Sequence, residues 1–531
     1  MHEKKKAIVR SSAKMSVMTM ISRIFGLVRD QLQAHFLGTT MLSDSFSVGF
    51  LIPNLLRRLF AEGSMTVSFV PVFTDVEHAR SKAETQRFLS SFFTLLALIL
   101  VVVTVLGYFA APLIVKLLYA SPNVLPEKYD LTVTLTRIMF PYIMFISLAA
   151  VVQGVLNVHG NFTVPAFTPV VLNIAIIGTV LLVHFCMPGL FPNLTYAFAF
   201  GTMAGGFCQL AFQLPFLWRT GYSLYPSFAF NDPKIVRVAK LFAPGIIGVG
   251  IYQVNVLVSY GFASSLGDGR ISALMFSSRI NELTLGIFAV SVATVMLPTL
   301  SRELLAKNID AFVSSMSYSV RIIALVTIPA TIGVFVLAEP IVSLLFRFGK
   351  FNADSVHLTA DGLVFISIAL FFIAAYRIIA QAFYSLKDTR TPVAVSALVF
   401  AMNALLCFVF TRIVPMDIRG IGLANSLSNI VMFVLLVVLL MRRLRTNVLR
   451  DGLGSFLTTI AAAVVMGAAA FALKYFFLPP TLDKLSLGAR LFGIIAVSIA
   501  VYVTCNVIFG NKDMREFASA LAGKLKRMRK G

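Results

Sequence analysis

Charged side chains occur inside two long apolar segments near the start of the chain. Between Ser16 and Pro71 they are Arg23, Arg29, Asp30, Asp44, Arg57, Arg58 and Glu62. A charge at the centre of a bilayer costs roughly 2.5–3.5 kcal/mol on insertion scales, so we expect these groups to line a polar space rather than to face lipid. Guanidinium groups stay protonated and donate paired hydrogen bonds, which suits a phosphate or pyrophosphate ligand. The arginines are therefore candidate anion-binding residues.

Helical spacing places most of these residues on one face of each segment. In the first segment, polar and small residues recur at steps of three and four, as on one side of a helix: Ser16, Thr19, Arg23, Gly26, Asp30 and Gln33. The second segment continues the pattern with Asp44, Ser47, Asn54, Arg58 and Glu62. Pro53 predicts a bend, because proline removes a backbone hydrogen bond. The bend leaves open whether Arg57 or Arg58 faces the polar space.

A second interpretation is that these charges pair with one another and merely join two helices. Arg23 would then pair with Asp30, and Arg58 with Glu62. We favour the ligand-binding interpretation, because the arginines outnumber the carboxylates and an unpaired buried charge is costly.

A smaller charged group lies on a later apolar segment. Ser272, Arg279, Glu282 and Gly286 step along one helical face there. The second half of the chain thus contributes chiefly Arg279 where the first half contributes four arginines. The predicted cavity is cationic mainly on one side.

The composition is that of a membrane protein. Hydrophobic residues make up 58% of the chain, charged residues 13%, and the mean hydropathy is +0.87, which excludes an ordinary soluble globular chain. A span needs about 20 apolar residues, and the chain holds about fourteen such stretches. They cover residues 14–36, 42–73, 88–119, 130–157, 165–186, 194–218, 238–264, 271–300, 311–337, 354–384, 391–412, 419–441, 454–477 and 488–509. We expect an all-α, polytopic protein with 14 transmembrane helices.

Basic residues gather in the loops of one side. Roughly 27 Lys and Arg lie on that side and roughly 9 on the other, so the positive-inside rule places both termini in the cytoplasm. The net charge of +22 does not predict nucleic-acid binding, because these residues are divided among short loops instead of forming one patch. The tail from Lys524 to Lys530 is expected to lie against anionic membrane lipids.

Matches at a constant offset indicate an internal duplication. The string APLIVKLLY at residues 111–119 matches EPIVSLLF at 339–346 with one gap. Four further pairs share an offset of about 227–230 residues, as a duplicated unit would produce: Val70-Pro71 with Leu297-Pro298, Gln153 with Gln381, Pro165 with Pro392, and Asn173 with Asn403. Six helices separate equivalent points, so the two copies have the same orientation. The expected parts are a cytoplasmic segment 1–13, a six-helix lobe 14–220, a linker 221–237, a second six-helix lobe 238–441, two helices within 442–510, and a basic cytoplasmic tail 511–531.

Two pseudo-symmetric lobes with polar residues facing inward are typical of a secondary transporter. The six histidines are isolated, and the chain has no H-E-x-x-H, G-x-S-x-G or Walker A string. We therefore expect no enzyme activity, no catalytic residues, no metal site and no cofactor. The driving force is expected to come from the membrane potential, from a gradient such as that of a monovalent cation, or from the substrate.

Four strings near the start of the chain are distinctive: SRIFGLVRD at 22–30, DSF at 44–46, PNLLRRLFAEG at 53–63 and FVP at 69–71. Together they resemble the MurJ (MviN) lipid II flippases of the multidrug/oligosaccharidyl-lipid/polysaccharide exporter superfamily. The resemblance continues through FPY at 140–142, AFTP at 166–169, Arg279, LP at 297–298, FYS at 383–385 and TP at 391–392. It covers nearly the whole chain, and the string at 53–63 is the most specific part.

The resemblance implies a bacterial inner-membrane protein that moves lipid II, the undecaprenyl-pyrophosphate-linked peptidoglycan precursor, from the cytoplasmic to the periplasmic leaflet by alternating access. It assigns substrate binding at the pyrophosphate to Arg23, Arg29, Arg57 and Arg279, with Arg58 as the alternative to Arg57. It assigns gating or salt bridges to Asp30, Asp44 and Glu62, to which we add Glu282. It also implies an apolar groove at the last two helices for the polyprenyl tail, and contact with the cell-wall synthesis machinery. Where some relatives carry an acid, this chain has Ser278, which leaves the partner of Arg279 open.

Two other classes of protein remain as alternatives. An exporter of another lipid-linked oligosaccharide or of a drug, in the same superfamily, would share the lobes but would not need the arginine cluster. A membrane enzyme or scaffold would need a catalytic set or a large soluble segment, and the sequence shows neither.

Overall fold

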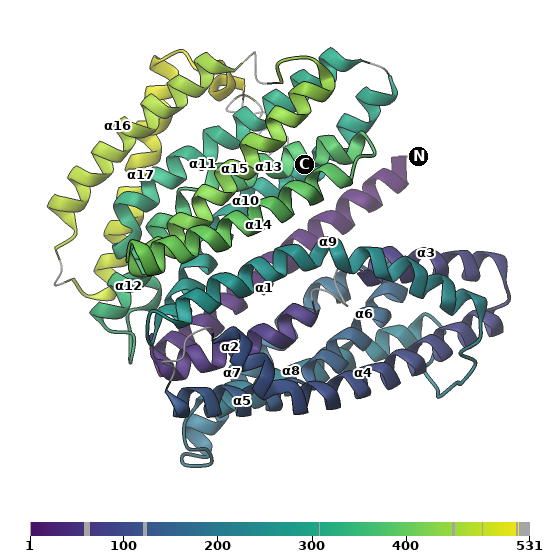
Figure 1. Cartoon of the computed structure of the whole chain (residues 1–531). Helices are drawn as coiled ribbons and strands as arrows, with labels where there is room; N and C mark the ends of the chain where they lie inside the picture. Colours follow the sequence, from purple (N-terminus) through teal and green to yellow (C-terminus); the bar gives the residue numbers. More distant parts are fainter. Residues whose placement is uncertain are drawn as a thin grey trace. The chain divides into compact units, whose positions relative to one another are not determined.

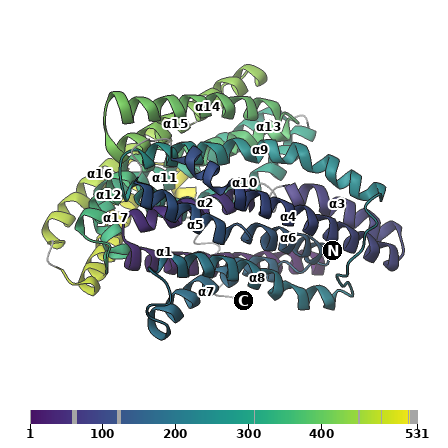
Figure 2. The same ribbon diagram turned by 60° about the horizontal axis from the view of Figure 1, so that its bottom comes forward.

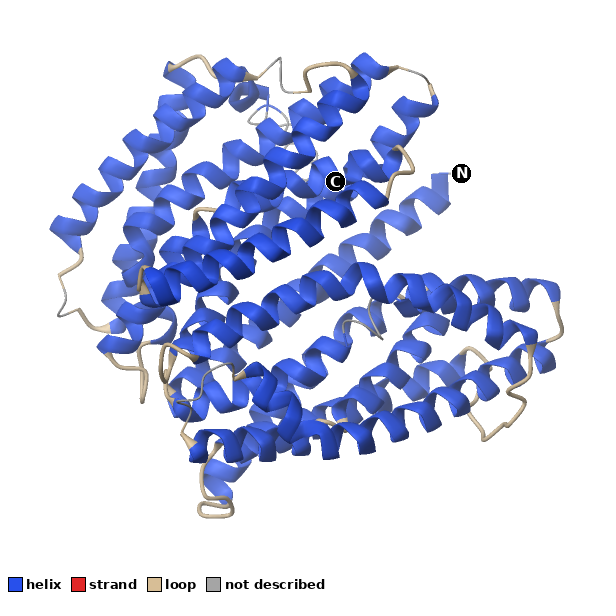
Figure 3. Ribbon diagram, in the orientation of Figure 1, coloured by secondary structure: helices blue, strands red, loops and turns tan. Residues whose placement is uncertain are grey.

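The computed structural model describes the backbone of residues 2–57, 64–119, 125–306, 308–448, 452–479, 482–516 and 519. Within these residues the regular elements are helices, without a strand (Figure 3). They are α1 (His2–Leu37), α2 (Met41–Arg57), α3 (Ser64–Ala79), α4 (Lys82–Leu118), α5 (Pro126–Met139), α6 (Tyr142–Val158), α7 (Thr163–Cys186), α8 (Thr195–Arg219), α9 (Pro233–Ser264), α10 (Arg270–Leu305), α11 (Ile309–Phe346), α12 (Ala353–Ser367), α13 (Leu370–Ser385), α14 (Arg390–Phe408), η2 (Val409–Ile413), α15 (Asp417–Leu444), α16 (Leu453–Phe477) and α17 (Lys484–Ile508). The predicted all-α class is confirmed.

The helices carry the apolar length that a bilayer requires. Eight segments of the described residues are long and apolar enough to span it, and a ninth is added if α12 and α13, which meet at a bend of 41°, form one span. The protein is thus a multi-pass membrane protein. The number of fourteen spans remains a prediction.

Contacts divide the chain into two compact units. Unit 1 comprises Met1–Ser272 and Phe348–Phe351, and unit 2 comprises Ala273–Arg347 and Asn352–Gly531. The segment Phe348–Phe351 belongs to unit 1 because the Lys350 amide donates to the His35 carbonyl at 2.9 Å. Unit 1 also includes α9, which packs against α3 and α4, although the duplication places this helix in the second lobe. The lobe boundaries derived from the duplication remain predictions.

Unit 1 has its core between α3, α4, α6 and α8. The aromatic rings of Phe69, Phe88 and Phe92 stack on one another with centroids 5.0–6.3 Å apart, an arrangement that stabilises aromatic pairs beyond their buried area. Neighbouring aliphatic side chains such as Val151 and Val155 of α6 are fully buried. Unit 1 is therefore held by close packing as well as by the polar contacts described below.

Unit 2 has its core around α13, whose Ala374, Ile378 and Ala382 repeat at steps of four and are fully buried. They pack with side chains of α10, α11, α14 and α15. The hairpin of α16 and α17 packs on α11, and both helices run side by side at one edge of unit 2 in two views (Figures 1 and 2).

Two long helices contain internal prolines whose missing N–H is compensated by a neighbouring helix. Proline leaves the carbonyl four residues earlier without its helical donor. In α4, Pro112 frees the carbonyl of Tyr108, and the Arg137 side chain of α5 donates to it at 3.2 Å. In α11, Pro340 frees the carbonyl of Val336, which accepts from Lys474 of α16 at 3.0 Å. These two prolines are equivalent in the duplication, and so is the form of their compensation.

The other internal proline of α11 is treated in the same way. Pro329 frees the carbonyl of Leu325, and the hydroxyl of Tyr502 in α17 donates to it at 2.8 Å. The hairpin α16–α17 is therefore bonded to α11 beside both of its internal prolines.

Candidate functional site

The polar face of α1 becomes more buried toward the end of the helix. Arg23 is half-buried, whereas Asp30 and Gln33 are buried. The Gln33 side-chain amide donates to the hydroxyls of Ser43 and Ser47 in α2, at 3.1 Å each. The end of this face thus contacts α2 through Gln33. That the polar residues of α1 line a polar space remains a prediction.

Arg29 and Asp30 form an ion pair between neighbours in sequence. Nη2 of Arg29 lies 2.7 Å and Nε 3.1 Å from the same oxygen, Oδ1 of Asp30. The arginine side chain is 12% exposed and the aspartate side chain 3%. The guanidinium carbon also lies 5.9 Å from the centre of the Phe50 ring. Asp30 thus pairs with Arg29, whereas the second sequence interpretation paired it with Arg23.

Arg57 is the last residue of α2 and is half-buried. Its Nε atom donates to the side-chain oxygen of Asn54 at 2.9 Å, one helical turn earlier. This bond orients the planar guanidinium, whose other nitrogens are donors as well. Arg58 and Glu62 lie outside the described residues, so the choice between Arg57 and Arg58 stays open.

Asp44 lies at the centre of a polar cluster that also contains Lys128, Asp268 and Ser272; we refer to these four residues as the Asp44 cluster. The Asp44 carboxylate is fully buried. Nζ of Lys128 lies 2.9 Å from Oδ2 of Asp44 and 2.8 Å from Oδ1 of Asp268. The lysine side chain is 3% exposed and that of Asp268 is 44% exposed. A buried carboxylate and a partly exposed one therefore share one buried ammonium group.

The Asp44 carboxylate also caps the start of α10. It accepts hydrogen bonds from the backbone amides of Gly269 at 2.8 Å and Ser272 at 2.9 Å, and from the Ser272 hydroxyl at 2.8 Å. The first amides of a helix have no internal acceptor and carry partial positive charge, so a carboxylate is favourable there. The helix start thus offsets part of the excess negative charge of the Asp44 cluster.

Sequence reasoning identified Asp44 but missed Lys128 and Asp268. Lys128 belongs to the first turn of α5, which begins at Pro126, and in the sequence it reads as a loop residue between two spans. The sequence did contain one signal for another member of the cluster, Ser272. It is separated from Asp44 by 228 positions along the chain, which is the offset of the duplication. The two residues occupy equivalent helix starts, and they bond to each other.

Arg279 and Glu282 lie in α10, within unit 2. Their side chains approach to 3.4 Å at a spacing of three residues, and are 34% and 56% exposed. Glu282 therefore supplies the partner that the sequence left open beside Ser278. An ion pair this exposed contributes at most about 1 kcal/mol, so little is lost if Arg279 exchanges this partner for a ligand.

Unit 2 also contains an apolar cavity of ≈ 340 Å³, which we call the unit-2 cavity. Its lining residues come from α10, α11 and α17: Ile280, Leu283, Thr284, Val326, Thr327, Ala330, Val334, Ile341, Leu344, Leu345, Leu491, Phe492 and Ile495. Thr284 and Thr327 are the two polar residues of this lining, and each donates its hydroxyl to its own helix backbone. The cavity therefore offers hydrocarbon to a ligand.

Acidic and thiol or imidazole side chains do not gather into a metal centre in the part of the chain that the structure describes. No group of three or more His, Cys, Asp or Glu residues is placed there to hold an ion. The charged residues found together are ion pairs and a helix cap.

A family model described as lipid II flippase MurJ matches residues 33–487. The chain belongs to the MurJ family. The match includes α2, which carries Asp44 and Arg57, and α10, which carries Arg279. Members of this family are transporters and not enzymes, and the protein is accordingly a transport protein of the lipid II flippase family.

Relatives and solved structures agree with this assignment. The probable lipid II flippase MurJ of Treponema pallidum (strain Nichols) is 32% identical over 489 residues, which cover 89% of this chain and 90% of the relative. The probable lipid II flippase MurJ of Vibrio cholerae is 34% identical over 433 residues, which cover 80% and 81%. A structure of the lipid II flippase MurJ in an inward closed conformation matches with a TM-score of 0.77 at 26% identity, over 93% of this chain and 98% of that one.

A more distant structural match reaches the wider superfamily. The inward-facing conformation of a multidrug resistance MATE family transporter of the MOP superfamily matches with a TM-score of 0.67 at 12% identity, over 83% of this chain and 99% of that one. At this identity the likeness to the multidrug transporter shows a shared fold alone. The MurJ family members match in sequence as well, so the alternative of a drug exporter is not favoured.

Proposed function

We propose that this chain moves lipid II across the inner membrane of a bacterium, from the cytoplasmic to the periplasmic leaflet, with both termini in the cytoplasm. The observation that carries the proposal is the family match over residues 33–487, which includes arginines held within apolar helices. An uncompensated arginine at that depth is costly, so it requires a polar partner such as a pyrophosphate.

The proposed headgroup site consists of Arg23, Arg29, Arg57 and Arg279, with Arg58 as the alternative to Arg57. Three of these arginines already have side-chain acceptors that fix the guanidinium plane: Asp30 for Arg29, Asn54 for Arg57 and Glu282 for Arg279. A pyrophosphate would replace or add to these acceptors, since a guanidinium has five N–H donors. Asp30 and Glu282 would then reclaim their arginines when the ligand leaves.

The Asp44 cluster is the proposed gate on the side of the membrane where α2 and α10 begin. A buried carboxylate that caps a helix and pairs with a lysine cannot separate from both without leaving charge exposed to a medium of low polarity. Such a site favours two discrete states, bonded or fully hydrated, over a gradual opening. We assign Glu62 the same kind of role on the basis of the resemblance.

The unit-2 cavity is the proposed place for part of the polyprenyl tail, because its lining is apolar and its wall includes α17. Its volume of ≈ 340 Å³ lies within the roughly 300–1,000 Å³ typical of ligand pockets. The headgroup would thus be bound by charge and the tail by hydrocarbon contact.

The first test is charge reversal at Arg57. Arg57→Glu should lower lipid II translocation in proteoliposomes at least tenfold, since hydrogen bonds to a charged group contribute about 1.5–3 kcal/mol. The translocation rate of Arg57→Lys should lie between those of the parent protein and Arg57→Glu. Lysine keeps the positive charge but lacks the planar guanidinium group with its paired N–H donors. Arg87→Glu, at an exposed position of α4, is the matched control. Full activity of Arg57→Glu would overturn the headgroup site.

The driving force for transport and the protein partners complete the proposed function. The chain has no nucleotide-binding string, so we propose coupling to the membrane potential or to a monovalent cation. Collapsing the potential with valinomycin and potassium, and separately exchanging sodium for an organic cation, would distinguish the two. We also propose that the protein meets the cell-wall synthesis machinery, which site-specific cross-linking in cells would test.

A further inference from the structure

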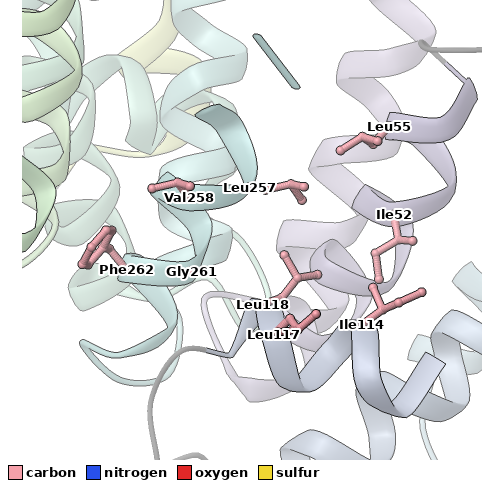
Figure 4. Close-up of a pocket in the computed structure, with 9 residues that line it drawn as sticks. All are labelled: Ile52, Leu55, Ile114, Leu117, Leu118, Leu257, Val258, Gly261 and Phe262. Atoms are coloured by element: carbon pink, nitrogen blue, oxygen red, sulfur yellow. The ribbon is translucent and has the colours of Figure 1, made fainter. Parts of the chain in front are cut away.

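Unit 1 contains an apolar cavity of ≈ 490 Å³ that the headgroup site does not use. We call it the unit-1 cavity. Its walls come from α2, α4 and α9, and its lining residues are all apolar: Ile52, Leu55, Ile114, Leu117, Leu118, Leu257, Val258, Gly261 and Phe262. Figure 4 shows Leu257 pointing from α9 toward Ile52 and Leu55 of α2, with Leu117 and Leu118 of α4 below the gap between them.

Five of these lining positions recur in the unit-2 cavity. On the second span of each lobe, Ile52 and Leu55 of α2 correspond to Ile280 and Leu283 of α10, at the same offset that relates Asp44 to Ser272. On the third span, the duplicated strings at 111–119 and 339–346 pair Ile114 with Ile341, Leu117 with Leu344, and Leu118 with Leu345. All ten residues line their respective cavities. The two cavities are therefore equivalent under the duplication.

The proline beside each cavity is also duplicated. Pro112 precedes Ile114 in α4 and Pro340 precedes Ile341 in α11. In both helices the freed carbonyl is bonded by a cation from another helix, Arg137 in unit 1 and Lys474 in unit 2. The helix that forms this wall is thus bonded to a neighbouring helix by the same type of contact in both units.

The third wall differs between the two cavities. In unit 1 it is α9, where Gly261 lets the helix approach α4 closely: a Cβ atom there would lie 3.2 Å from the Leu118 carbonyl oxygen, which is tighter than ordinary contact. In unit 2 the wall is α17, with Leu491, Phe492 and Ile495.

We propose that the unit-1 cavity is a second hydrocarbon site for the polyprenyl chain of the substrate. The inference rests on the proposed function, because it takes the unit-2 cavity as the first such site. Inside a bilayer, an apolar cavity gains no hydrophobic free energy by binding one lipid tail in place of another. Selectivity for the substrate must therefore come from a second contact that holds its headgroup nearby. Arg57, a proposed pyrophosphate ligand, lies two residues after Leu55 on α2, about 3 Å further along the helix axis and about 200° around it. A bound polyprenyl diphosphate would therefore reach the cavity around the helix, which its long tail permits.

That headgroup contact explains why the substrate would fill the cavity in preference to a bulk lipid. A polyprenyl chain whose diphosphate is bound at Arg57 has a high effective concentration at the neighbouring cavity. A phospholipid lacks this advantage.

The test places the photoreactive residue p-benzoylphenylalanine at single positions of the full-length protein in proteoliposomes with radiolabelled lipid II. Leu117 reports on the unit-1 cavity and Leu344 on the unit-2 cavity. Leu106, which is also on α4 and exposed to a similar degree (62%, against 74% for Leu117) but lines neither cavity, is the matched control. We expect at least fivefold more labelling from Leu117 than from Leu106. Excess undecaprenyl phosphate should abolish that labelling, and phosphatidylglycerol should not.

Filling the cavity gives a second measurement. Val258→Trp should lower labelling from Leu117 at least fivefold and leave labelling from Leu344 unchanged, while Ala330→Trp should do the reverse. Val258→Leu controls for folding, together with the melting temperature in detergent.

The other possible outcomes distinguish failure of the second tail site from failure of the first tail site in the proposed function. Labelling from Leu344 but background labelling from Leu117 overturns the second site and leaves the proposed function standing. Labelling from Leu117 that phosphatidylglycerol removes as well as undecaprenyl phosphate shows an ordinary bilayer lipid and also overturns the second site. Background labelling at both positions overturns both tail sites.

Discussion

The ammonium nitrogen of Lys474 lies 3.0 Å from the carbonyl oxygen of Val336, four residues before Pro340. Proline cannot supply the N–H that this carbonyl would otherwise accept. A cation from α16 therefore replaces a backbone donor of α11. The oxygen of such a carbonyl carries partial negative charge and attracts a cation in apolar surroundings. This attraction also explains how a lysine is accommodated among the helices.

The first prediction concerns this contact. Lys474→Met should lower the free energy of unfolding by about 1.5–3 kcal/mol, the contribution of a hydrogen bond to a charged group. In a Pro340→Ala background the same substitution should cost much less, because residue 340 then donates to Val336 itself. Thermal melts of the four proteins in detergent measure the coupling. Equal losses in both backgrounds would show that Lys474 acts through another contact.

The second prediction concerns Tyr502, which donates to the Leu325 carbonyl at 2.8 Å, four residues before Pro329. Tyr502→Phe should cost about 0.5–1.5 kcal/mol, as expected for a neutral hydrogen bond. Pro329→Ala should remove that cost, whereas Pro340→Ala should not, since it frees a different carbonyl. Rescue by both alanines alike would argue for a general straightening of α11 rather than a specific bond.

The third prediction concerns the Asp44 cluster. Lys128→Met leaves the fully buried Asp44 carboxylate and the nearby Asp268 without their common cation, and should destabilise the protein by about 3–5 kcal/mol. Adding Asp44→Asn should recover part of the loss, because the buried negative charge is then removed. The measurement is the melting temperature of the single and double variants. A double variant less stable than Lys128→Met would show that the helix cap matters more than the ion pair.

The fourth prediction concerns acid stability at the loop before α14. Backbone and side-chain donors of Thr391 hold the pKa of the Asp388 carboxyl below its ordinary value, with Arg443 adding to the effect. A lowered pKa contributes stability that is present above the ordinary pKa of an aspartate and is lost as the pH falls through the lowered value. Asp388→Asn should therefore be less stable than the parent at pH 7, and the difference should shrink below about pH 4. A difference that stays constant with pH would exclude this carboxylate as the cause.

Much of the architecture followed from local patterns. Apolar stretches of sufficient length identified the membrane class, and matches at a constant offset indicated a duplication, which the equivalent prolines and cavity linings now extend. Asp44 was recognisable because a carboxylate in an apolar helix requires a partner. These features depend on composition and on spacing along the chain, which the sequence displays directly.

The ion-pair partners of the charged residues were harder to predict from the sequence. Arg29 pairs with its neighbour Asp30, although their side chains leave the helix about 100° apart, because the long arginine side chain can fold back. Lys128 reaches Asp44 from 84 positions further along the chain, and Asp268 contacts the same lysine from a loop much later in the sequence. Such contacts depend on how helices meet, and no periodicity within one segment encodes that meeting.

The sequence by itself determined that the chain is a helical membrane protein with arginines in its apolar segments, because the cost of placing charge and unsatisfied backbone in hydrocarbon restricts what can span a bilayer. The tertiary structure alone decided which carbonyl Lys474 and Tyr502 bond, which acids share Lys128, and that equivalent positions of the two repeats enclose two cavities. These are relations between helices far apart in the chain, and packing settles them through the close fit of many side chains at once.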